Sequence, residues 1–408
     1  MDEKKLKQDY TRLAEKLAQR QVDAEAVKTK VMQLAIETPS WGYGDSGTRF
    51  KVFTQPGVAR NAYEKIQDAA MVHKVTGIAP TVAIHIPWDW VDDFTALKQH
   101  AEKLGVKIGS VNPNLFQDED YKYGSVTHVD PIVRSKAVDH ILECIQIAEV
   151  VNSKVLSLWL ADGSDYPGQV HFRQRKQRLL ESLQKVYKNL PQDMCLLVEY
   201  KLFEPAFYHT DLADWGITYI ITKKLGERAK VLVDMGHHAQ GTNVEWIVAM
   251  LIDEGKLGGF HFNNRKYADD DLTVGAINPY EIFLIFNELI DAESDPDVDL
   301  DVSYMLDQSH NTKLKIEATI QSVMFVQETY AKALTVDRKK LAKARAENDA
   351  VTAELALQEA FNTDVTPLLQ MARIEKGLEP DPLVAYKNSG YFEKICEARG
   401  AGAGKGWE

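Results

Sequence analysis

Short motifs of carboxylate and imidazole side chains recur between Glu199 and His310. They contain residue types that bind divalent cations, and no cysteine lies in this stretch. Oxygen and nitrogen donors without thiolate suit Mg²⁺, Mn²⁺, Co²⁺ or Zn²⁺, and Mn²⁺ and Co²⁺ match the mixture best. One ion takes about four to six ligands. The carboxylates and imidazoles of these motifs exceed that number, so they predict two neighbouring ions that share a carboxylate. The predicted metal ligands are Glu199, Asp234, His237, His261, Asp269, Asp271 and Asp307.

Each motif also has a purely structural interpretation. An isolated histidine at the end of a strand is more often a hydrogen-bonded structural residue. The run Asp269–Asp271 is typical of a solvated loop or a helix N-terminus, and Asp234 could cap a helix. The metal interpretation is favoured because five consecutive strand–loop junctions supply ligand-type or aromatic groups. Asp234 and His237 are three residues apart where a strand enters a turn, so both can face one ion.

Eight short apolar or β-branched runs alternate with amphipathic stretches of helical periodicity. This alternation predicts a parallel sheet, and eight repeats predict an α/β protein with a (β/α)8 TIM barrel, whose functional groups follow the strands. An open doubly wound sheet is the alternative, but no glycine-rich phosphate loop follows any run. The expected strands are Thr38–Tyr43, Thr81–Ile86, Val106–Val111, Lys154–Leu160, Met194–Tyr200, Val231–Asp234, Gly258–Phe262 and Val302–Leu306.

Helical segments are expected before and after the barrel in the sequence. Leu6, Tyr10, Leu13 and Leu17 are spaced three or four apart and predict helices within 1–36 that pack on the barrel. The barrel itself is expected over 37–311. No strand pattern follows, and 339–361 is rich in strong helix formers. Residues 312–408 are therefore expected to form a helical extension that contacts the barrel or another subunit.

Composition and charge exclude several classes of protein. The 408 residues are 45% hydrophobic and 26% charged, which is typical of a folded globular chain. A net charge of −12 disfavours binding to a phosphate backbone, so no nucleic-acid partner is expected. Three widely spaced cysteines favour a reducing compartment. Neither a signal peptide nor an apolar run of about 18 residues is found, which predicts a cytoplasmic protein without a membrane partner.

The motifs also resemble those of a known family. They follow the family's order over about residues 14–388 and read PSWG with GTRF, HIPWD, KYGS, DGSxxPGQ, ExKxxEPAFY, LVDxGHHAxxTN, GKLGGFHFN with DDDL, and DQSHN. In these motifs the chain resembles L-rhamnose isomerase, in the broad-specificity branch of the xylose-isomerase-like superfamily. The resemblance implies a homotetrameric barrel enzyme that converts L-rhamnose to L-rhamnulose and accepts other aldoses such as D-allose.

The resemblance divides the predicted ligands between two ions. It implies a structural ion held by Glu199, Asp234, His261 and Asp307. It implies a catalytic ion held by Asp234, His237, Asp269 and Asp271, with Asp234 bridging. Mn²⁺ is the expected cation, and Co²⁺, Mg²⁺ and Zn²⁺ are the alternatives.

Further residues receive roles from the same resemblance. Lys201 corresponds to the lysine that polarises the substrate carbonyl, and His85 to the histidine near the sugar ring oxygen. The aromatic side chains that are implied to wall the sugar pocket are Trp88, Phe116 and Trp159, together with Trp41 and Phe50 of the PSWG–GTRF segment. Two sites depart from the family pattern, since Tyr200 replaces a histidine and Asn263-Asn264-Arg265 replaces Asn-Asp-Ser. Neither departure falls on a matched ligand, so metal binding is expected to persist while sugar preference shifts.

The segment 42–50, GYGDSGTRF, predicts a long exposed loop after the first strand, because it carries three glycines and several polar residues. An aromatic side chain on such a loop needs apolar cover. The resemblance implies that Phe50 completes the pocket of a neighbouring subunit, and the exposed loop supports this expectation. The alternative is that Phe50 folds back onto the top of its own barrel.

Aldose–ketose isomerisation moves hydrogen between C1 and C2, either as a proton through an enediol or as a hydride. The carboxylates are expected to be consumed as ligands, which leaves Lys201 as a cationic donor and favours a metal-assisted hydride shift. His85 or a water linked to Asp307 is expected to open the sugar ring. A metal-dependent sugar epimerase on the same barrel is the closest alternative. An endonuclease would need a basic groove, and a sugar-binding protein would need neither the paired carboxylates nor Lys201.

Overall fold

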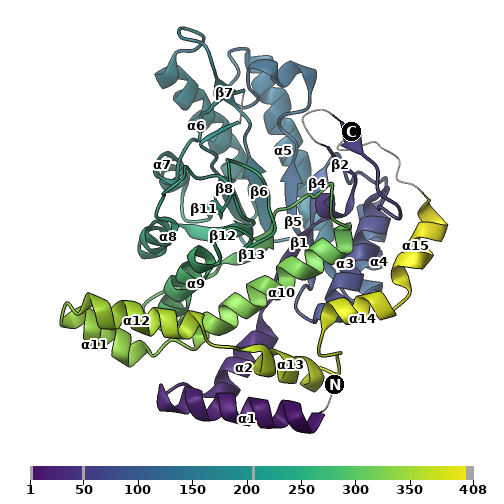
Figure 1. Cartoon of the computed structure of the whole chain (residues 1–408). Helices are drawn as coiled ribbons and strands as arrows, with labels where there is room; N and C mark the ends of the chain where they lie inside the picture. Colours follow the sequence, from purple (N-terminus) through teal and green to yellow (C-terminus); the bar gives the residue numbers. More distant parts are fainter. Residues whose placement is uncertain (1–2, 48–50, 205–206, 401–408) are drawn as a thin grey trace.

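Eight parallel strands close into a barrel at the centre of the protein (Figure 1). The structure is a computed structural model and describes residues 3–47, 51–204 and 207–400. The (β/α)8 prediction is confirmed. In the order in which they pair around the barrel, the strands are β1 (Glu37–Pro39), β13 (Ser303–Leu306), β12 (Leu257–Phe262), β11 (Ala229–Asp234), β8 (Cys195–Glu199), β6 (Val155–Trp159), β5 (Lys107–Pro113) and β4 (Thr81–Ile86).

A helix follows each barrel strand and covers its outer face. Six of these helices begin at an Asp or Asn whose side chain accepts a backbone N–H of the first turn, which satisfies one of the donors left open there. In chain order, the eight helices are α3 (Ala62–Thr76), α4 (Phe94–Lys103), α5 (Pro131–Val151), α6 (Phe172–Asn189), α7 (Trp215–Leu225), α8 (Val244–Asp253), α9 (Pro279–Glu293) and α10 (Lys315–Leu334).

Strands β8 and β11 are apolar along most of their length and end at a carboxylate. Within β8, for example, Leu196, Leu197 and Val198 are buried, as expected of a parallel strand that is covered on both sides. The parallel register then brings the terminal residues of neighbouring strands together. Asp234 at the end of β11 pairs with His261 of β12, and Glu199 at the end of β8 pairs with Trp159 of β6.

The first strand is shorter than expected. Instead of one strand over Thr38–Tyr43, β1 ends at Pro39 and a 3-10 helix spans Ser40–Tyr43. Proline has no N–H to continue the ladder, which explains the early end. Gly42 then passes close to the chain, since a Cβ there would lie 2.9 Å from the carbonyl oxygen of Gln308.

The prediction of an exposed loop at 42–50 is wrong for the first half of this segment. Tyr43, Asp45 and Ser46 are buried, and the segment continues into a short hairpin of β2 (Ser46–Gly47) and β3 (Val52–Phe53). The reason is that Ser46 lies against the N-terminal end of α10. There the Lys315 ammonium donates a hydrogen bond to the Ser46 hydroxyl over 2.5 Å. Phe50 lies outside the described residues.

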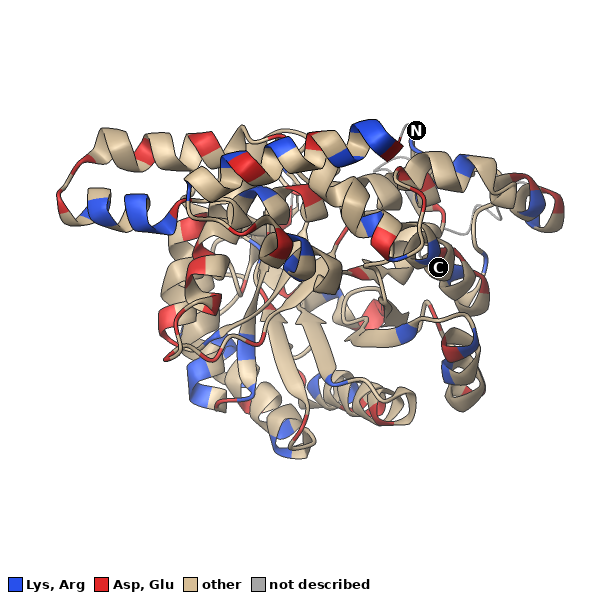
Figure 2. Ribbon diagram, turned by 90° about the horizontal axis from the view of Figure 1, so that it is seen from below, with Lys and Arg blue, Asp and Glu red and all other residues tan. Residues whose placement is uncertain are grey.

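The segments outside the barrel pack on each other as well as on the barrel helices. Helices α1 (Glu3–Gln19) and α2 (Ala24–Gln33) lie against α13 (Thr366–Glu375), and α2 also touches α10 (Figure 1). The stretch 339–361 forms two helices, α11 (Arg338–Ala346) and α12 (Ala350–Phe361), because Asn348 adopts a left-handed conformation with φ of 57° between them. In Figure 2 the outer helices carry interspersed acidic and basic side chains.

The described part of the chain finishes with two short helices that return to the barrel side. After α14 (Pro382–Asn388), helix α15 (Tyr391–Arg399) lies beside α3. The Arg399 guanidinium donates to both carboxylate oxygens of Asp68 over 2.8 and 3.0 Å, and all these groups are buried. Among the described residues, no helix is both long and apolar enough to cross a membrane.

Candidate metal centre

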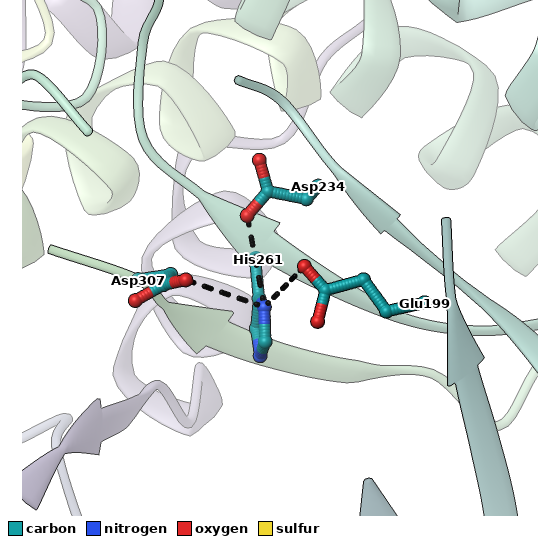
Figure 3. A group of neighbouring side chains, drawn as sticks. All are labelled: Glu199, Asp234, His261 and Asp307. Carbon is teal, nitrogen blue, oxygen red and sulfur yellow. Dashed lines mark hydrogen bonds and ion pairs between the residues drawn. The ribbon is translucent and has the colours of Figure 1, made fainter. Parts of the chain in front are cut away.

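Three side chains from β8, β11 and β12 and one that directly follows β13 converge at one end of the barrel (Figure 3). Each offers a ligand atom, and these atoms all lie within 4.8 Å of one another. The His261 Nδ1 atom is 3.3 Å from Glu199 Oε1, 3.6 Å from Asp234 Oδ2 and 3.7 Å from Asp307 Oδ2. Three carboxylates and one imidazole at this spacing form a ligand set that suits a divalent cation.

A second group lies beside the first and shares Asp234 with it. Asp234, His237 and Asp269 also offer ligand atoms within 4.8 Å of one another. His237 Nε2 lies 3.3 Å from Asp269 Oδ1 and 3.9 Å from Asp234 Oδ1. The other ring nitrogen, Nδ1, lies 2.9 Å from the carbonyl oxygen of Tyr200, which fixes the plane of the ring.

Asp271 is partly buried next to the second group without belonging to either set of mutually close atoms. Its Oδ1 accepts a hydrogen bond from the Asn263 side-chain amide over 3.1 Å. Asp271 also has a left-handed backbone, with φ of 43°, and its carbonyl oxygen lies 2.8 Å from His310 Nε2. Its predicted role as a metal ligand stays a prediction.

The pKa values of the side chains in these two groups are shifted in ways that indicate a strong attraction for positive charge. Burial raises the pKa of Asp234 to about 7, and the neighbouring carboxylates add to that rise. Burial lowers the pKa of His261, but the attraction of Glu199 outweighs it and the pKa rises to about 9. For His237, likewise, attraction by Asp234 and Asp269 overcomes burial and holds the pKa well above its ordinary value. Protonated imidazoles thus offset the carboxylates here, a task that divalent cations perform equally well.

Lys201 follows Glu199 by two residues and contributes the nearest ammonium group. Its Nζ lies 2.5 Å from Asp269 Oδ2 and 2.7 Å from Glu204 Oε2, and it sits 5.0 Å from the centre of the Trp159 ring. Burial disfavours the charged ammonium, yet the attraction of Asp269 and Glu204 prevails and raises the pKa of Lys201. Lys201 therefore remains a cation beside the second group.

All the described aromatic residues of the predicted pocket lie in one chain of ring contacts. His85 stacks on Trp88 with 3.9 Å between ring centres, and it meets Trp41 and Phe116 edge-on at 5.7 and 5.8 Å. Phe116 in turn lies 4.8 Å from Trp159. The wall thus runs from Trp41, whose Nε1 donates to Asp307 over 2.7 Å, to the ring beneath Lys201. It connects the two sides of the candidate metal centre.

Two polar atoms of this wall are buried without a hydrogen-bond partner among the described residues. They are Nδ1 of His85 and Nε1 of Trp159. Burial, together with the positive charge of Lys65, lowers the pKa of His85 to about 3, so its ring is neutral. Unpaired buried polar atoms are costly, which is consistent with a polar ligand such as a sugar hydroxyl meeting them.

Comparison with known proteins establishes the family. A protein of Rhizobium meliloti (strain 1021), described as a probable sugar isomerase, is 47% identical over 406 residues, which cover 98% of this chain and 94% of the relative. The chain belongs to this sugar isomerase family. A probable sugar isomerase of Mesorhizobium japonicum is similar to the same degree, with 46% identity over 404 residues and the same coverage. No protein-family model matches the chain.

More distant similarities extend to a xylose isomerase and to the folds of two sugar epimerases. The xylose isomerase of Thermus thermophilus is 24% identical over 201 residues, or 47% of this chain and 52% of that protein. The structure of an L-ribulose 3-epimerase superposes with a TM-score of 0.55 at 13% identity, covering 78% of this chain and 98% of the epimerase. A D-psicose 3-epimerase gives 0.51 at 13% identity, over 77% and 99%. At such identity the epimerases support the barrel fold alone.

Two of the residues that depart from the L-rhamnose isomerase pattern, Tyr200 and Arg265, make buried contacts near the turn that follows β11. The Tyr200 hydroxyl and His238 Nε2 form a buried hydrogen bond of 2.6 Å. The Arg265 guanidinium donates to the carbonyl oxygen of Met235 over 2.6 Å and pairs with buried Glu281 at 3.3 Å. The Arg265 guanidinium supports the turn that carries His237, and the Tyr200 carbonyl oxygen contacts the His237 ring.

Some residues that orient the functional side chains were not predicted from the sequence. Asn263, which follows β12, donates its amide to Asp234 and Asp271. Glu204 holds Lys201 from the short strand β9 (Phe203–Glu204). An Asn or Glu after a strand is common in loops, so residue type alone offered no signal. The ExKxxE spacing of the sequence could have singled out Glu204.

Proposed function

We propose that this sugar isomerase is a divalent-metal-dependent aldose–ketose isomerase that converts L-rhamnose to L-rhamnulose and also accepts D-allose. The observation that carries the proposal is the sharing of Asp234 by two groups of ligand atoms, with the Lys201 ammonium beside one of them. The choice of sugar is supported by the run of motifs that resembles L-rhamnose isomerase.

We propose that two cations divide the ligands as the resemblance to L-rhamnose isomerase implies. Glu199, Asp234, His261 and Asp307 would hold one cation. Asp234, His237 and Asp269 would hold the other, with Asp271 adding a further oxygen. Mn²⁺ is the proposed cation, with Co²⁺, Mg²⁺ and Zn²⁺ as alternatives, because the donors are oxygen and imidazole. When bound, such cations supply Lewis acidity that polarises adjacent sugar oxygens and favours hydride transfer between C1 and C2.

Lys201 is proposed to donate a hydrogen bond to the sugar O1 as negative charge develops there. Its burial strengthens that interaction, since little water competes for the ammonium. Trp159 beneath the ammonium and Glu204 beside it hold the side chain in place. A positioned, permanently charged donor of this kind suits transfer of a hydride better than abstraction of a proton, which would need a free base.

The aromatic wall is proposed to bind the sugar and to exclude water. Trp88, Phe116 and Trp159 offer faces for the apolar side of the sugar, and Trp41 borders Asp307. Neutral His85 can accept or donate at Nδ1, which fits a group that moves a proton at the ring oxygen during ring opening. A water linked to Asp307 is the alternative for that step.

The oligomer is proposed to be a homotetramer in which the helical extension, 312–408, contacts other subunits. Val351 and Leu355 support this proposal, since they lie one turn apart on α12 with 68% and 53% of their surfaces exposed. Within the described residues, α11 and α12 project as a pair away from the barrel (Figure 1). An exposed apolar stripe on a projecting helix pair is typical of a surface that binds another chain.

The test is a screen for ketose formation from aldohexoses and 6-deoxyhexoses after chelation and readdition of each cation. We expect L-rhamnose to be converted with Mn²⁺ and not without a cation. A protein that converts only ketoses into epimeric ketoses would instead be an epimerase. The same reaction in D2O checks the hydride route. Nearly stoichiometric deuterium at C1 of the ketose would establish an enediol and contradict the proposed shift.

A further inference from the structure

The side-chain amide of Asn263 lies between the two oxygens of Asp234. Its Nδ2 is 3.1 Å from Oδ1 and 3.1 Å from Oδ2. The same nitrogen is 3.1 Å from Oδ1 of Asp271. Asn263 follows β12 directly and is completely buried, so water does not compete for these contacts. One amide group therefore serves two acidic side chains.

The orientation of the amide follows from its surroundings. Turning the group over would place its carbonyl oxygen against three carboxylate oxygens, which would repel it. In the observed orientation, Oδ1 points away from these partners and accepts no hydrogen bond among the described residues. It lies near Gly236, where a Cβ would be only 3.2 Å from it and 3.1 Å from Asp234 Oδ1. A glycine at 236 thus allows the turn and the amide to approach each other.

The position of Nδ2 matters for how Asp234 can bind cations. A carboxylate binds one cation through both oxygens when the cation sits at the edge between them. In this protein the amide occupies that edge. The two oxygens face different imidazoles, since Oδ2 lies 3.6 Å from His261 Nδ1 and Oδ1 lies 3.9 Å from His237 Nε2. The backbone N–H of Gly236 further holds Oδ1 over 2.6 Å.

We propose that Asn263 is a positioning residue that blocks the chelating edge of Asp234, so that the two oxygens must bind two different cations. The inference rests on the proposed two-cation function and names the group that enforces it. Because the amide is neutral, it directs Asp234 without neutralising the charge that attracts the cations. Without it, Asp234 is free to chelate one cation with both oxygens, and the second group loses a ligand.

The experiment titrates Mn²⁺ into the metal-free full-length protein and follows the number of bound ions and the electron paramagnetic resonance spectrum. Wild type is expected to bind two ions whose spins are coupled through the shared carboxylate. Asn263→Ala is expected to bind the first ion normally and the second at least ~10-fold more weakly, the usual scale for loss of a ligand's partner. Its spectrum should show the resolved hyperfine pattern of an isolated Mn²⁺.

Asn287→Ala is the matched control, because Asn287 is another buried asparagine that hydrogen-bonds Arg338 far from the metal centre. It should retain two coupled ions. If Asn263→Ala does not fold, as judged by its circular dichroism against this control, Asn263→Ser replaces it with the same expected result. Two coupled ions of unchanged affinity in the Asn263 variant would overturn the inference alone. A single ion in wild type would instead overturn the two-cation function, and the inference with it.

Discussion

The Lys201 ammonium lies 2.5 Å from the Asp269 carboxylate, whose other oxygen faces His237 at 3.3 Å. Asp269 is therefore shared between the ammonium that is proposed to act on the sugar and the imidazole that is proposed to bind a cation. Burial tends to raise the pKa of Asp269, but the attraction of His237 and Lys201 holds it far below its ordinary range. The relationship couples the two proposed functions through one carboxylate.

Lys201→Met is expected to lower kcat by roughly 10²–10³ while KM changes little, because the ammonium is needed only as charge develops on O1. Steady-state kinetics with L-rhamnose and Mn²⁺ measure both constants. Lys223→Met, which removes an exposed lysine of α7, is the control and should leave both unchanged. A rise in KM with an unaltered kcat would show that Lys201 only binds the sugar.

Substitutions of the shared and unshared ligands should differ in thermal melts with Mn²⁺. Binding at a hundredfold excess over Kd stabilises the native state by about 2.7 kcal/mol per site. Asp234→Asn is expected to lose most of the Mn²⁺-dependent rise in Tm, because both sites use this carboxylate. His237→Ala and Asp269→Asn should keep the part of the rise in Tm that comes from cation binding at the first group. They should nevertheless lose turnover.

Asp253→Asn, at the exposed end of α8, is the control for these melts. It should show the full rise in Tm. An identical response of Asp234→Asn, His237→Ala and Asp269→Asn to Mn²⁺ would argue against a bridging role for Asp234.

His85 should make the protein less stable in acid. Burial lowers its pKa in the native state to about 3 from an ordinary value of 6.5, so between these limits the unfolded chain binds a proton that the native protein does not. The free energy of unfolding contributed by this group is therefore highest above pH 6.5 and falls as the pH drops. The slope is ~1.4 kcal/mol per pH unit.

Urea unfolding of wild type and His85→Phe from pH 7 to pH 4.5 measures this effect. The phenyl ring keeps the stacking surface on Trp88 and cannot titrate. The stability of wild type relative to the variant is expected to decline as the pH falls. His209→Phe, at an exposed histidine, serves as the control. Parallel pH profiles for wild type and His85→Phe would contradict a neutral His85.

Phe50 is expected to act in the pocket of a neighbouring subunit. Two inactive variants, Phe50→Ala and His237→Ala, are dissociated, mixed and reassembled. If Phe50 acts across subunits, some pockets of the hybrid contain both wild-type groups, so activity should partly return. Each variant reassembled alone is the control. Confirmed hybrids without activity would assign Phe50 to the pocket of its own subunit.

The strands of the barrel could be predicted because most are short apolar or β-branched runs that alternate with amphipathic helical stretches. The run Val231–Asp234, for instance, lies within β11 and ends at the same residue. The predicted end of the first strand was wrong, because Pro39 ends the ladder of backbone hydrogen bonds within a run that looks continuous in the sequence. Burial of Asp45 and Ser46 also escaped prediction, since it depends on Lys315, which lies 269 residues beyond Ser46.

The ligand types could be predicted from the sequence, but the groups that orient them could not. Carboxylates and imidazoles at consecutive strand ends identify themselves by chemistry. Asn263 contacts Asp234 across 29 residues, and Trp41 contacts Asp307 across 266. Such partners are set by the register of the barrel and by side-chain rotamers, neither of which a single sequence displays.

The packing of α1 and α2 on α13 has a consequence for synthesis on the ribosome. Leu6, Leu13 and Leu17 are buried in the finished protein, yet α13 begins only at Thr366. At about 5–20 residues per second, roughly 20–70 seconds separate their translation. During that interval α1 of the nascent chain lacks the contacts that it makes with α13 in the folded protein. Helix α1 would therefore be among the last of the described segments to gain its full native cover.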